Sequence, residues 1–188
     1  MADLRRSQLH GWGMTQAITA DLLEASSEAE IAATLGEADR GVIARGLGRS
    51  YGDAAQLAGG TALSMLEHPG QLHINEQGLA TVGGGVSLDA LIAEGLPRGW
   101  FVPVTPGTRQ VTVGGAIAFD VHGKNHHVDG SFASHVRSMK LLTPTGLREL
   151  TPEANPELFW ATAGGMGLTG VVLEANVQMT PVSSSAVV

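Results

Sequence analysis

The amino-acid sequence predicts an α+β fold in which mixed sheets combine with short helices. Apolar runs of strand length alternate with short amphipathic segments along the 188 residues. Two pairs of these runs are separated only by short glycine-containing turns, which is typical of antiparallel hairpins. Glycine supplies 26 residues, about twice the average usage, and gathers between the runs without a period. These hairpins argue against a doubly wound parallel sheet.

The first third of the chain predicts one helix and two strands after an irregular start. Residues 1–12 show no pattern and are expected to form a loose segment. Ser26 and Ser27 precede residues 28–35, where the serine cap and the early glutamates predict a helix. Residues 41–45 and 61–66 are short apolar runs beside glycine, so both are expected to be buried strands.

The middle of the chain predicts a hairpin, a helix and a strand. Residues 71–75 and 79–82 alternate in polarity on either side of a turn that contains Gly78. Ser87 is the expected cap of a helix that ends near Gly95. Residues 101–104 are the expected strand that follows.

The remainder predicts two helices, a second hairpin and a long last strand. Residues 114–120 are small and apolar, which favours a buried helix. Residues 137–143 and 147–151 flank a Pro-Thr-Gly turn. Residues 156–161 begin with proline, as many helices do, and residues 170–179 alternate as a strand. We expect no anchor for the tail from residue 181 onward.

Composition excludes several classes of function. The formal net charge is −7, which disfavours nonspecific binding to nucleic acid. Cysteine is absent, so disulfides, zinc–thiolate sites and thiol catalysis are excluded, and a reducing compartment is compatible. The start of the chain lacks the apolar run of a signal peptide, and no stretch of about 18 apolar residues predicts a transmembrane helix.

The first glycine-rich loop, residues 44–53, follows a predicted strand. Successive main-chain N–H groups in such a turn can form an anion-binding nest, which suits a diphosphate. Gly46 and Gly48 match the start of a dinucleotide fingerprint, but Tyr51 stands at its third glycine and no helix pattern follows. The P-loop pattern is absent. The alternative for this loop is a tight turn without a ligand.

Two further loops have a similar composition. Residues 106–118 lead into the small-residue helix, whose N-terminus is expected to present N–H groups to a phosphate; the alternative is close helix packing. Residues 163–170 hold four glycines, and Gly83, Gly84 and Gly85 form another run. Such glycines indicate close approach of the backbone to another group.

A histidine-rich segment spans residues 120–127. His122 and His126 have a spacing of four, and with His127 and His135 they could serve a metal-dependent enzyme. However, Gly123 lies between the first two and no zincin pattern follows. The segment also suits contact with a substrate oxygen beside a redox centre, and the remaining alternative is a polar surface loop.

The order of these segments resembles the FAD-binding domain of the vanillyl-alcohol-oxidase, or PCMH-type, flavoprotein family. The resemblance runs from about Gly11 to Pro181. It is carried by ARGLGRSYGD at 44–53, PGTRQVTVGGAIA at 106–118, HGKNHH at 122–127, and ELFWAT at 157–162 with the GLTG that ends at Gly170.

This resemblance implies a PCMH-type fold of two α/β subdomains with mixed sheets. It divides the chain into an N-terminal segment at 1–10, the FAD-binding domain at 11–181, and a tail at 182–188 that leads to a substrate domain. The implied reaction is FAD-dependent oxidation of the C2 hydroxyl of a lipid-linked ribose to a ketone, for cell-wall arabinan synthesis, with a reductase partner. The implied location is cytoplasmic, in contact with the membrane through the lipid substrate, with the periplasm as the alternative.

The resemblance also implies the site residues. Tyr51, His122 and Lys124 match positions on the substrate side of the flavin, and no catalytic residue is assigned. Matching the FAD-binding positions are Ala44, Arg45, Gly46, Leu47, Gly48, Arg49, Ser50, Tyr51, Gly52, Asp53, Gly107, Thr112, Val113, Gly114, Gly115, Phe119, Asp120, Val121, His122 and Val172.

Three positions depart from the family pattern. Many relatives link FAD covalently through a histidine of the first loop, and Arg49 stands in that place. A guanidinium cannot act as that nucleophile, so we expect noncovalent FAD. Ala54 stands where asparagine is expected, and Phe119 where cysteine is expected.

Two alternatives to this function remain within flavin chemistry. One is another sugar-alcohol or aldonolactone oxidase of the same superfamily. The other is a non-catalytic FAD-binding module.

Overall fold

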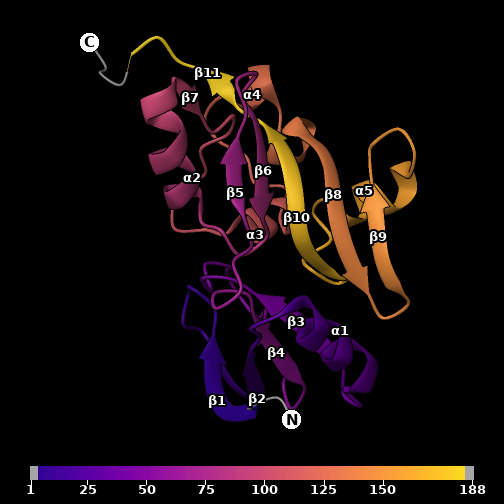
Figure 1. Cartoon of the computed structure of the whole chain (residues 1–188). Helices are drawn as coiled ribbons and strands as arrows, with labels where there is room; N and C mark the ends of the chain where they lie inside the picture. The colour runs from indigo at the N-terminus through magenta and orange to yellow at the C-terminus, as the bar shows by residue number, and fades with distance from the viewer. Residues whose placement is uncertain (1–3, 185–188) are drawn as a thin grey trace.

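Residues 4–184 of the chain are described by a computed structural model, which contains two main sheets, a small two-stranded sheet and five α-helices (Figure 1). The smaller sheet has the order β1-β2-β4-β3 and lies at the bottom of Figure 1 beside α1. It pairs β1 with β2 antiparallel, whereas β2 and β3 both run parallel to β4, so the sheet is mixed. Its elements are β1 Leu4–His10, β2 Ala17–Glu24, α1 Glu28–Glu37, β3 Val42–Arg45 and β4 Thr61–Ser64.

The larger sheet has the order β5-β6-β10-β8-β9, and each of its neighbouring strands runs antiparallel. Helices α2 and α3 pack against its inner face. The strands are β5 Leu72–Ile74, β6 Leu79–Gly83, β8 Val136–Thr143, β9 Gly146–Leu150 and β10 Val171–Gln178. The helices are α2 Leu88–Gly95, α3 Val113–Ala118, α4 His126–Asp129 and α5 Pro156–Thr162, and a small pair joins β7 Trp100–Phe101 to β11 Thr180–Pro181.

Most local elements agree with the sequence predictions. Ser27 caps α1 by accepting a hydrogen bond from the N–H of Glu30, and Ser87 caps α2 by accepting one from Ala90. Both predicted hairpins form. The mixed sheets with short helices confirm the α+β class.

The start of the chain was predicted wrongly. Residues 4–10 are not loose, because β1 pairs with β2 from Leu4↔Leu23 to His10↔Ala17. Only Leu9 of β1 is buried, so this strand is held by main-chain pairing and lacks the apolar alternation that marks a strand in sequence. Residues 1–3 lie outside the described part of the chain.

Two smaller predictions also differ from the structure. Of residues 101–104 only Phe101 belongs to a strand, although Val102 and Val104 are buried. The tail has an anchor at its start, because Pro181 pairs with Trp100 and the N–H of Val182 donates to Gly99 O at 2.8 Å. Residues 185–188 of that tail lie outside the described range.

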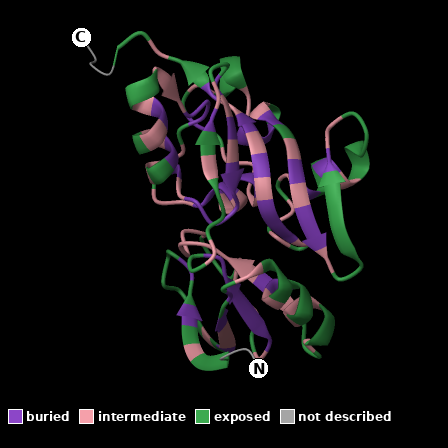
Figure 2. Ribbon diagram, viewed as in Figure 1, coloured by how far each residue is buried: buried purple, intermediate pink, exposed green. Residues whose placement is uncertain are grey.

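The described structure has three buried hydrophobic clusters, and two of them fix the arrangement of the sheets. The main core lies between the larger sheet and helices α2 and α3, and the central strands of that sheet carry much of the buried colour in Figure 2. A second core contains Ile31 of α1 and Leu63 of β4 together with Leu142 of β8 and Val171 of β10. Because these residues come from both sheets, the two halves share buried apolar surface. No helix among residues 4–184 is long and apolar enough to cross a bilayer.

Candidate cofactor site between the two sheets

A cavity of about 510 Å³ lies where the two halves meet. That volume is within the range of about 300–1,000 Å³ that is usual for small-molecule sites. One wall comes from β3 and the loop that follows it, and the other from α3 and the loop before β10. The described lining residues are Trp12, Ala44 to Tyr51, Ala55, Met65, Gly84, Pro106, Gly107, Thr108, Val111, Thr112, Gly114, Gly115, Ala118, Phe119, Val121, Thr162, Met166, Gly167, Gly170, Val171 and Val172.

Most residues predicted for the cofactor line this cavity. They arrive from four separate segments of the chain, which only the fold brings together. Those that line it are Ala44, Arg45, Gly46, Leu47, Gly48, Arg49, Ser50, Tyr51, Gly107, Thr112, Gly114, Gly115, Phe119, Val121 and Val172.

Other predicted residues do not line the cavity. Val113 is fully buried in the main core, where it packs against the larger sheet. Gly52 and Asp53, the last two residues of the first loop, are exposed. The carboxylate of Asp120 points to a neighbouring turn, where it accepts hydrogen bonds from Ser131 Oγ at 2.7 Å and Ala133 N at 2.9 Å.

The first loop supplies the main-chain donors of the site. Within the described structure, no N–H of residues 46–51 donates to a protein acceptor. Gly48 has a φ of 66°, the left-handed conformation that aims successive N–H groups to one side. Unpaired main-chain N–H groups are costly when they are kept from water, so this run suits an anionic ligand.

Helix α3 does not supply such donors, contrary to the sequence prediction. The N–H of Val113 donates to Val86 O and that of Gly114 to Gly84 O, both at 2.8 Å. The N–H of Gly115 donates to Thr112 Oγ1 at 3.1 Å. The first turn of α3 is therefore satisfied by the protein, and its small residues serve close packing, which was the alternative interpretation.

Gly46 shows why the first loop can lie against α3. A Cβ at Gly46 would come within 2.8 Å of Thr112 Cγ2 and would also meet Thr112 Oγ1. Thr112 is buried and caps α3, so its side chain cannot turn away without losing that bond. Gly84 has a similar role, since a Cβ there would collide with the carbonyl oxygen of Val172. Glycine at these positions brings two walls of the cavity together.

The lining carries positive charge only. Arg45 and Arg49 line the cavity, and no aspartate or glutamate does so among the described residues. Arg45 donates to Ala55 O at 3.0 Å and to His10 O at 2.8 Å, and it forms no ion pair in the described structure. Burial lowers the pKa of Arg45 from its ordinary value, because desolvation disfavours the charged form. A half-buried guanidinium without a carboxylate is the feature expected beside an anionic ligand.

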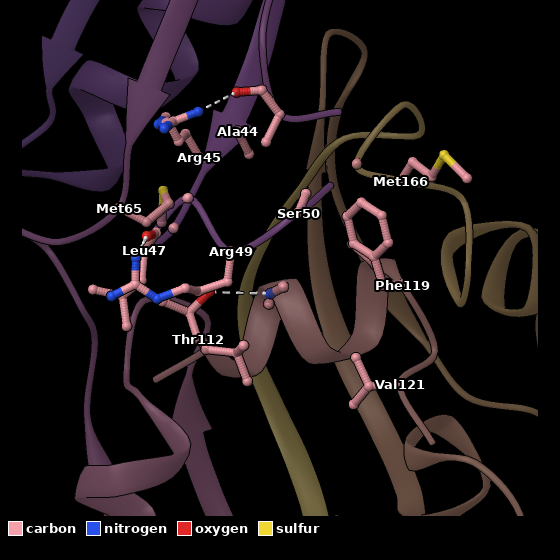
Figure 3. Close-up of a pocket in the computed structure, with 18 of the residues that line it drawn as sticks. Ala44, Arg45, Leu47, Arg49, Ser50, Met65, Thr112, Phe119, Val121 and Met166 are labelled. Atoms are coloured by element: carbon pink, nitrogen blue, oxygen red, sulfur yellow. Dashed lines mark hydrogen bonds between the residues drawn. The ribbon is translucent and has the colours of Figure 1, made fainter. Parts of the chain in front are cut away.

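The rest of the cavity wall is apolar (Figure 3). Leu47 and Met65 lie on one side, and Phe119 and Met166 on the other. Met166 is held in a left-handed conformation with a φ of 56°, and its N–H donates to Ala118 O at 2.7 Å. An apolar slot beside a cationic loop suits a ligand with a flat ring and a phosphate group.

The four histidines of residues 122–135 and Lys124 lie outside the cavity lining, although Val121 of the histidine-rich segment belongs to it. His122 and Lys124 are exposed. The rings of His122 and His126 meet edge to face at 5.6 Å between centroids, and those of His126 and His127 do the same. His135 Nε2 contacts Asp129 O at 2.8 Å instead. Among residues 4–184, no three His, Asp or Glu side chains come together as metal ligands would.

Several lining residues were not predicted from the sequence. Ala55, Met65 and Thr162 reach the cavity from segments whose composition carries no ligand signal. Trp12 reaches it from the turn between β1 and β2, a hairpin that the sequence did not reveal. Met65 lies within the predicted strand at 61–66, which gave no reason to place it at a ligand site.

Comparison with known proteins agrees with this site. Residues 20–151 match the FAD binding domain family. The chain is 52% identical over 186 residues to decaprenylphosphoryl-beta-D-ribose oxidase of Mycolicibacterium smegmatis, covering 95% of this chain and 40% of that protein. It is 52% identical over 100 residues to an uncharacterized protein in the mprA 5′ region of Streptomyces coelicolor, covering 53% of this chain and 27% of that protein.

A third relative is an uncharacterized oxidoreductase of the fasciation locus of Rhodococcoides fascians, 32% identical over 142 residues, covering 75% of this chain and 32% of that protein. The chain thus spans 40% or less of the length of each of these relatives. The unpaired amides of the first loop, the two arginines and the apolar slot fit the diphosphate and the ring system of FAD. The family match covers most of the chain, and we conclude that this chain belongs to the FAD binding domain family.

Proposed function

We propose that the cavity holds FAD noncovalently and that this chain is the cofactor domain of an oxidoreductase. The observation that carries this proposal is the run of unpaired N–H groups at residues 46–51 beside Arg45 and Arg49. That arrangement would hold the diphosphate, while Phe119 and Met166 would flank the ring system. Arg49 occupies the position at which many family members carry the linking histidine, which supports a noncovalent complex.

The proposed reaction is oxidation of the C2 hydroxyl of decaprenylphosphoryl-ribose to a ketone. Its support is the 52% identity to the mycolicibacterial oxidase of that name. Bound FAD would supply the two-electron acceptor for this oxidation, which removes a hydride from the carbinol carbon and a proton from the hydroxyl group. We propose that a reductase partner then completes an epimerisation in cell-wall arabinan synthesis, and that the protein works in the cytoplasm against the membrane that carries its lipid substrate.

The chain's own residues would bind and orient in this reaction. Tyr51 is exposed at the mouth of the cavity, where its ring is available to a substrate. His122 and Lys124 are exposed beyond Val121, which lines the cavity. We propose all three for the substrate side, with Lys124 and His122 as polar anchors near the reacting oxygen. In the full-length protein, replacing Lys124 with alanine should slow turnover and leave FAD affinity unchanged.

The test of the cofactor proposal is a titration of the purified protein with FAD and with riboflavin, followed by flavin fluorescence. FAD should bind more tightly, because riboflavin lacks the phosphates. Arg45→Met should weaken FAD binding by about tenfold, as expected when a charge-assisted contact of about 1.5 kcal/mol is lost, and should leave riboflavin binding unchanged. Arg148→Met, at an exposed position of β9 outside the cavity lining, is the matched control. Equal affinity for both flavins would contradict the proposed role of the first loop.

The noncovalent proposal has a separate test. Acid precipitation of the FAD-loaded protein should release all flavin into the supernatant, and yellow precipitated protein would contradict it.

The substrate proposal is tested by adding the lipid-linked ribose, a free sugar alcohol or an aldonolactone to the loaded protein. Bleaching of the flavin absorption by the lipid-linked ribose alone is the expected result for the full-length protein, whereas the cofactor domain by itself is expected to be inactive.

A further inference from the structure

The turn between β1 and β2 is tied to the first loop at three points. The N–H of Trp12 donates to Ser50 O at 2.8 Å, and Arg45 Nη2 donates to His10 O at 2.8 Å. Gly11 packs directly on the loop, because a Cβ there would come within 2.8 Å of Ser50 O. The turn and the loop therefore hold each other in place at the mouth of the cavity.

Within this contact, the indole of Trp12 lies against the guanidinium of Arg49. The distance from Arg49 Cζ to the ring is 4.6 Å, which is a cation–π contact. Arg49 Nη1 donates to Leu47 O at 3.1 Å, and in the described structure Arg49 forms no ion pair. A guanidinium that stacks by its face keeps its edge N–H groups free for a ligand. Trp12 is 53% exposed, so it contributes little to the core and its place is at the site.

We propose that Trp12 is a positioning residue of the cofactor site, which holds the Arg49 guanidinium ready for the diphosphate of FAD. This inference rests on the proposed function. Without the indole face, Arg49 keeps only its bond to Leu47 O and can turn toward solvent. Removal of Trp12 should therefore weaken FAD binding only when Arg49 is present.

A double-mutant cycle tests this dependence. FAD affinity is measured for the wild type, Trp12→Met, Arg49→Leu and the double variant, with Trp12→Phe as the conservative replacement. Trp12→Met keeps apolar bulk but has no π face, and should weaken binding by about 3- to 30-fold. Trp12→Phe should stay within about threefold of the wild type, since it keeps a π face. In the Arg49→Leu background, Trp12→Met should cost less than about twofold.

The controls separate the possible outcomes. Trp160→Met replaces a tryptophan of α5 that is 47% exposed and lies outside the cavity lining, and should leave affinity unchanged. Circular dichroism and thermal unfolding check each fold, and Trp12→Leu replaces Trp12→Met if the latter does not fold. Equal loss from Trp12→Met with and without Arg49, or no loss at all, overturns the inference while leaving the proposed function intact. A wild type that binds no FAD overturns the proposed function, and the inference with it.

Discussion

Gly46 and Gly107 both line the cavity, but only Gly46 must be glycine for steric reasons. A Cβ at Gly46 would meet the buried Thr112, whereas a Cβ at Gly107 would have no atom within 4 Å. Neither has a positive φ, so the difference between them is one of space. The two positions thus form a matched pair in one cavity wall.

Gly46→Ala should therefore destabilise the protein by about 1–3 kcal/mol, as overpacking usually does. It should also weaken FAD binding, because the first loop must move away from α3 to make room. Gly107→Ala should leave the free energy of unfolding within about 0.5 kcal/mol of the wild type. Urea unfolding measures both values. Equal stability of the two variants would mean that the loop moves away from Thr112 without cost.

At the scale of elements, Asp120 connects the end of α3 to the turn at residues 131–135. Its φ is 39°, an unusual value that aspartate tolerates better than most residues. Its carboxylate accepts from both Ser131 and Ala133. These two hydrogen bonds fix the segment between Phe119 and Val121, which both line the cavity. Asp120 therefore shapes the site without facing it.

Asp120→Ala should lower the free energy of unfolding by about 1–3 kcal/mol, since it leaves Ser131 Oγ and Ala133 N without this acceptor. Asp120→Asn should cost less, because the amide oxygen can still accept from Ala133 N and asparagine tolerates the same backbone conformation. Thermal or urea unfolding distinguishes the variants, with the exposed Asp53→Ala as control. An equal loss of stability in the alanine and asparagine variants would show that the negative charge of Asp120 contributes more to stability than its hydrogen bonds do.

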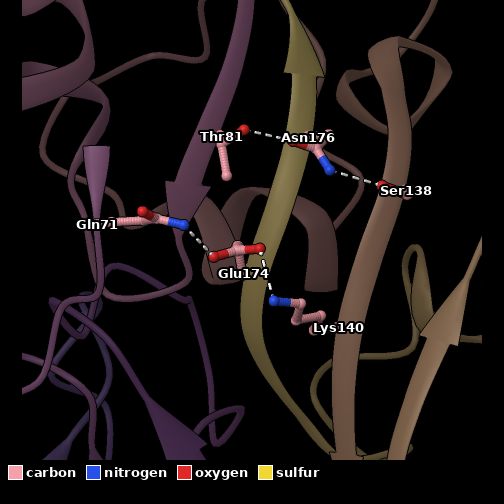
Figure 4. Close-up of polar contacts among 6 residues, drawn as sticks. All are labelled: Gln71, Thr81, Ser138, Lys140, Glu174 and Asn176. Atoms are coloured by element: carbon pink, nitrogen blue, oxygen red, sulfur yellow. Dashed lines mark hydrogen bonds and ion pairs between the residues drawn. The ribbon is translucent and has the colours of Figure 1, made fainter. Parts of the chain in front are cut away.

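Polar side chains also join three strands across the outer face of the larger sheet (Figure 4). Thr81 Oγ1 donates to Asn176 Oδ1, and Asn176 Nδ2 donates to Ser138 Oγ. Glu174 accepts from Gln71 Nε2 at 2.6 Å and pairs with Lys140 Nζ at 3.1 Å. The hydrogen bond and the charge of Glu174 raise the pKa of Lys140 above its ordinary value of 10.5.

A raised lysine pKa stabilises the folded state below pH 10.5, and this contribution is lost as the pH rises through the higher folded value. Lys140→Met should thus cost about 0.5 kcal/mol at pH 7, a small value because the ion pair is partly exposed and screened. The difference from the wild type should vanish well above pH 10.5. Urea unfolding at both pH values measures it, with Arg137→Met of the same strand as control. A difference that persists at high pH would assign the effect to packing.

At the scale of the whole molecule, the cavity is built by both sheets. Its first wall follows β3 of the smaller sheet, and its second precedes β10 of the larger one. The shared core, which contains Leu63 and Val171, holds these walls in one arrangement. A ligand that fills the cavity therefore contacts both halves at once.

Binding of FAD should slow amide hydrogen exchange at residues 46–51 and at residues 164–170 together. The first set gains acceptors for unpaired N–H groups, and the second becomes covered. Residues 146–150 of β9, at the far edge of the larger sheet, should exchange at an unchanged rate. Exchange measured by mass spectrometry with and without FAD checks this. Protection of one set alone would place the ligand on one wall and contradict a site between the sheets.

The local elements of this protein are determined by the sequence. The caps of α1 and α2, the two hairpins and the long last strand depend on residues within a few positions of each other, so pattern reveals them. The sequence did not predict the charged strand β1, because this strand forms through main-chain pairing with β2 and its own residues show no strand pattern. Trp12 could not be recognised as a site residue without that hairpin.

From the sequence alone we could predict that the glycine-rich loops lie close to another group. The order of these loops and the residues beside them identified the first loop as a cofactor loop. Which group each glycine contacts became visible only in the folded chain. The N–H of Gly114 donates to Gly84 O, thirty positions earlier in the chain. The main-chain N–H groups of residues 46–51 have no acceptor among residues 4–184. The physical reason is that the composition of a loop determines its conformational freedom, but its hydrogen-bond partners come from distant segments that only folding brings close.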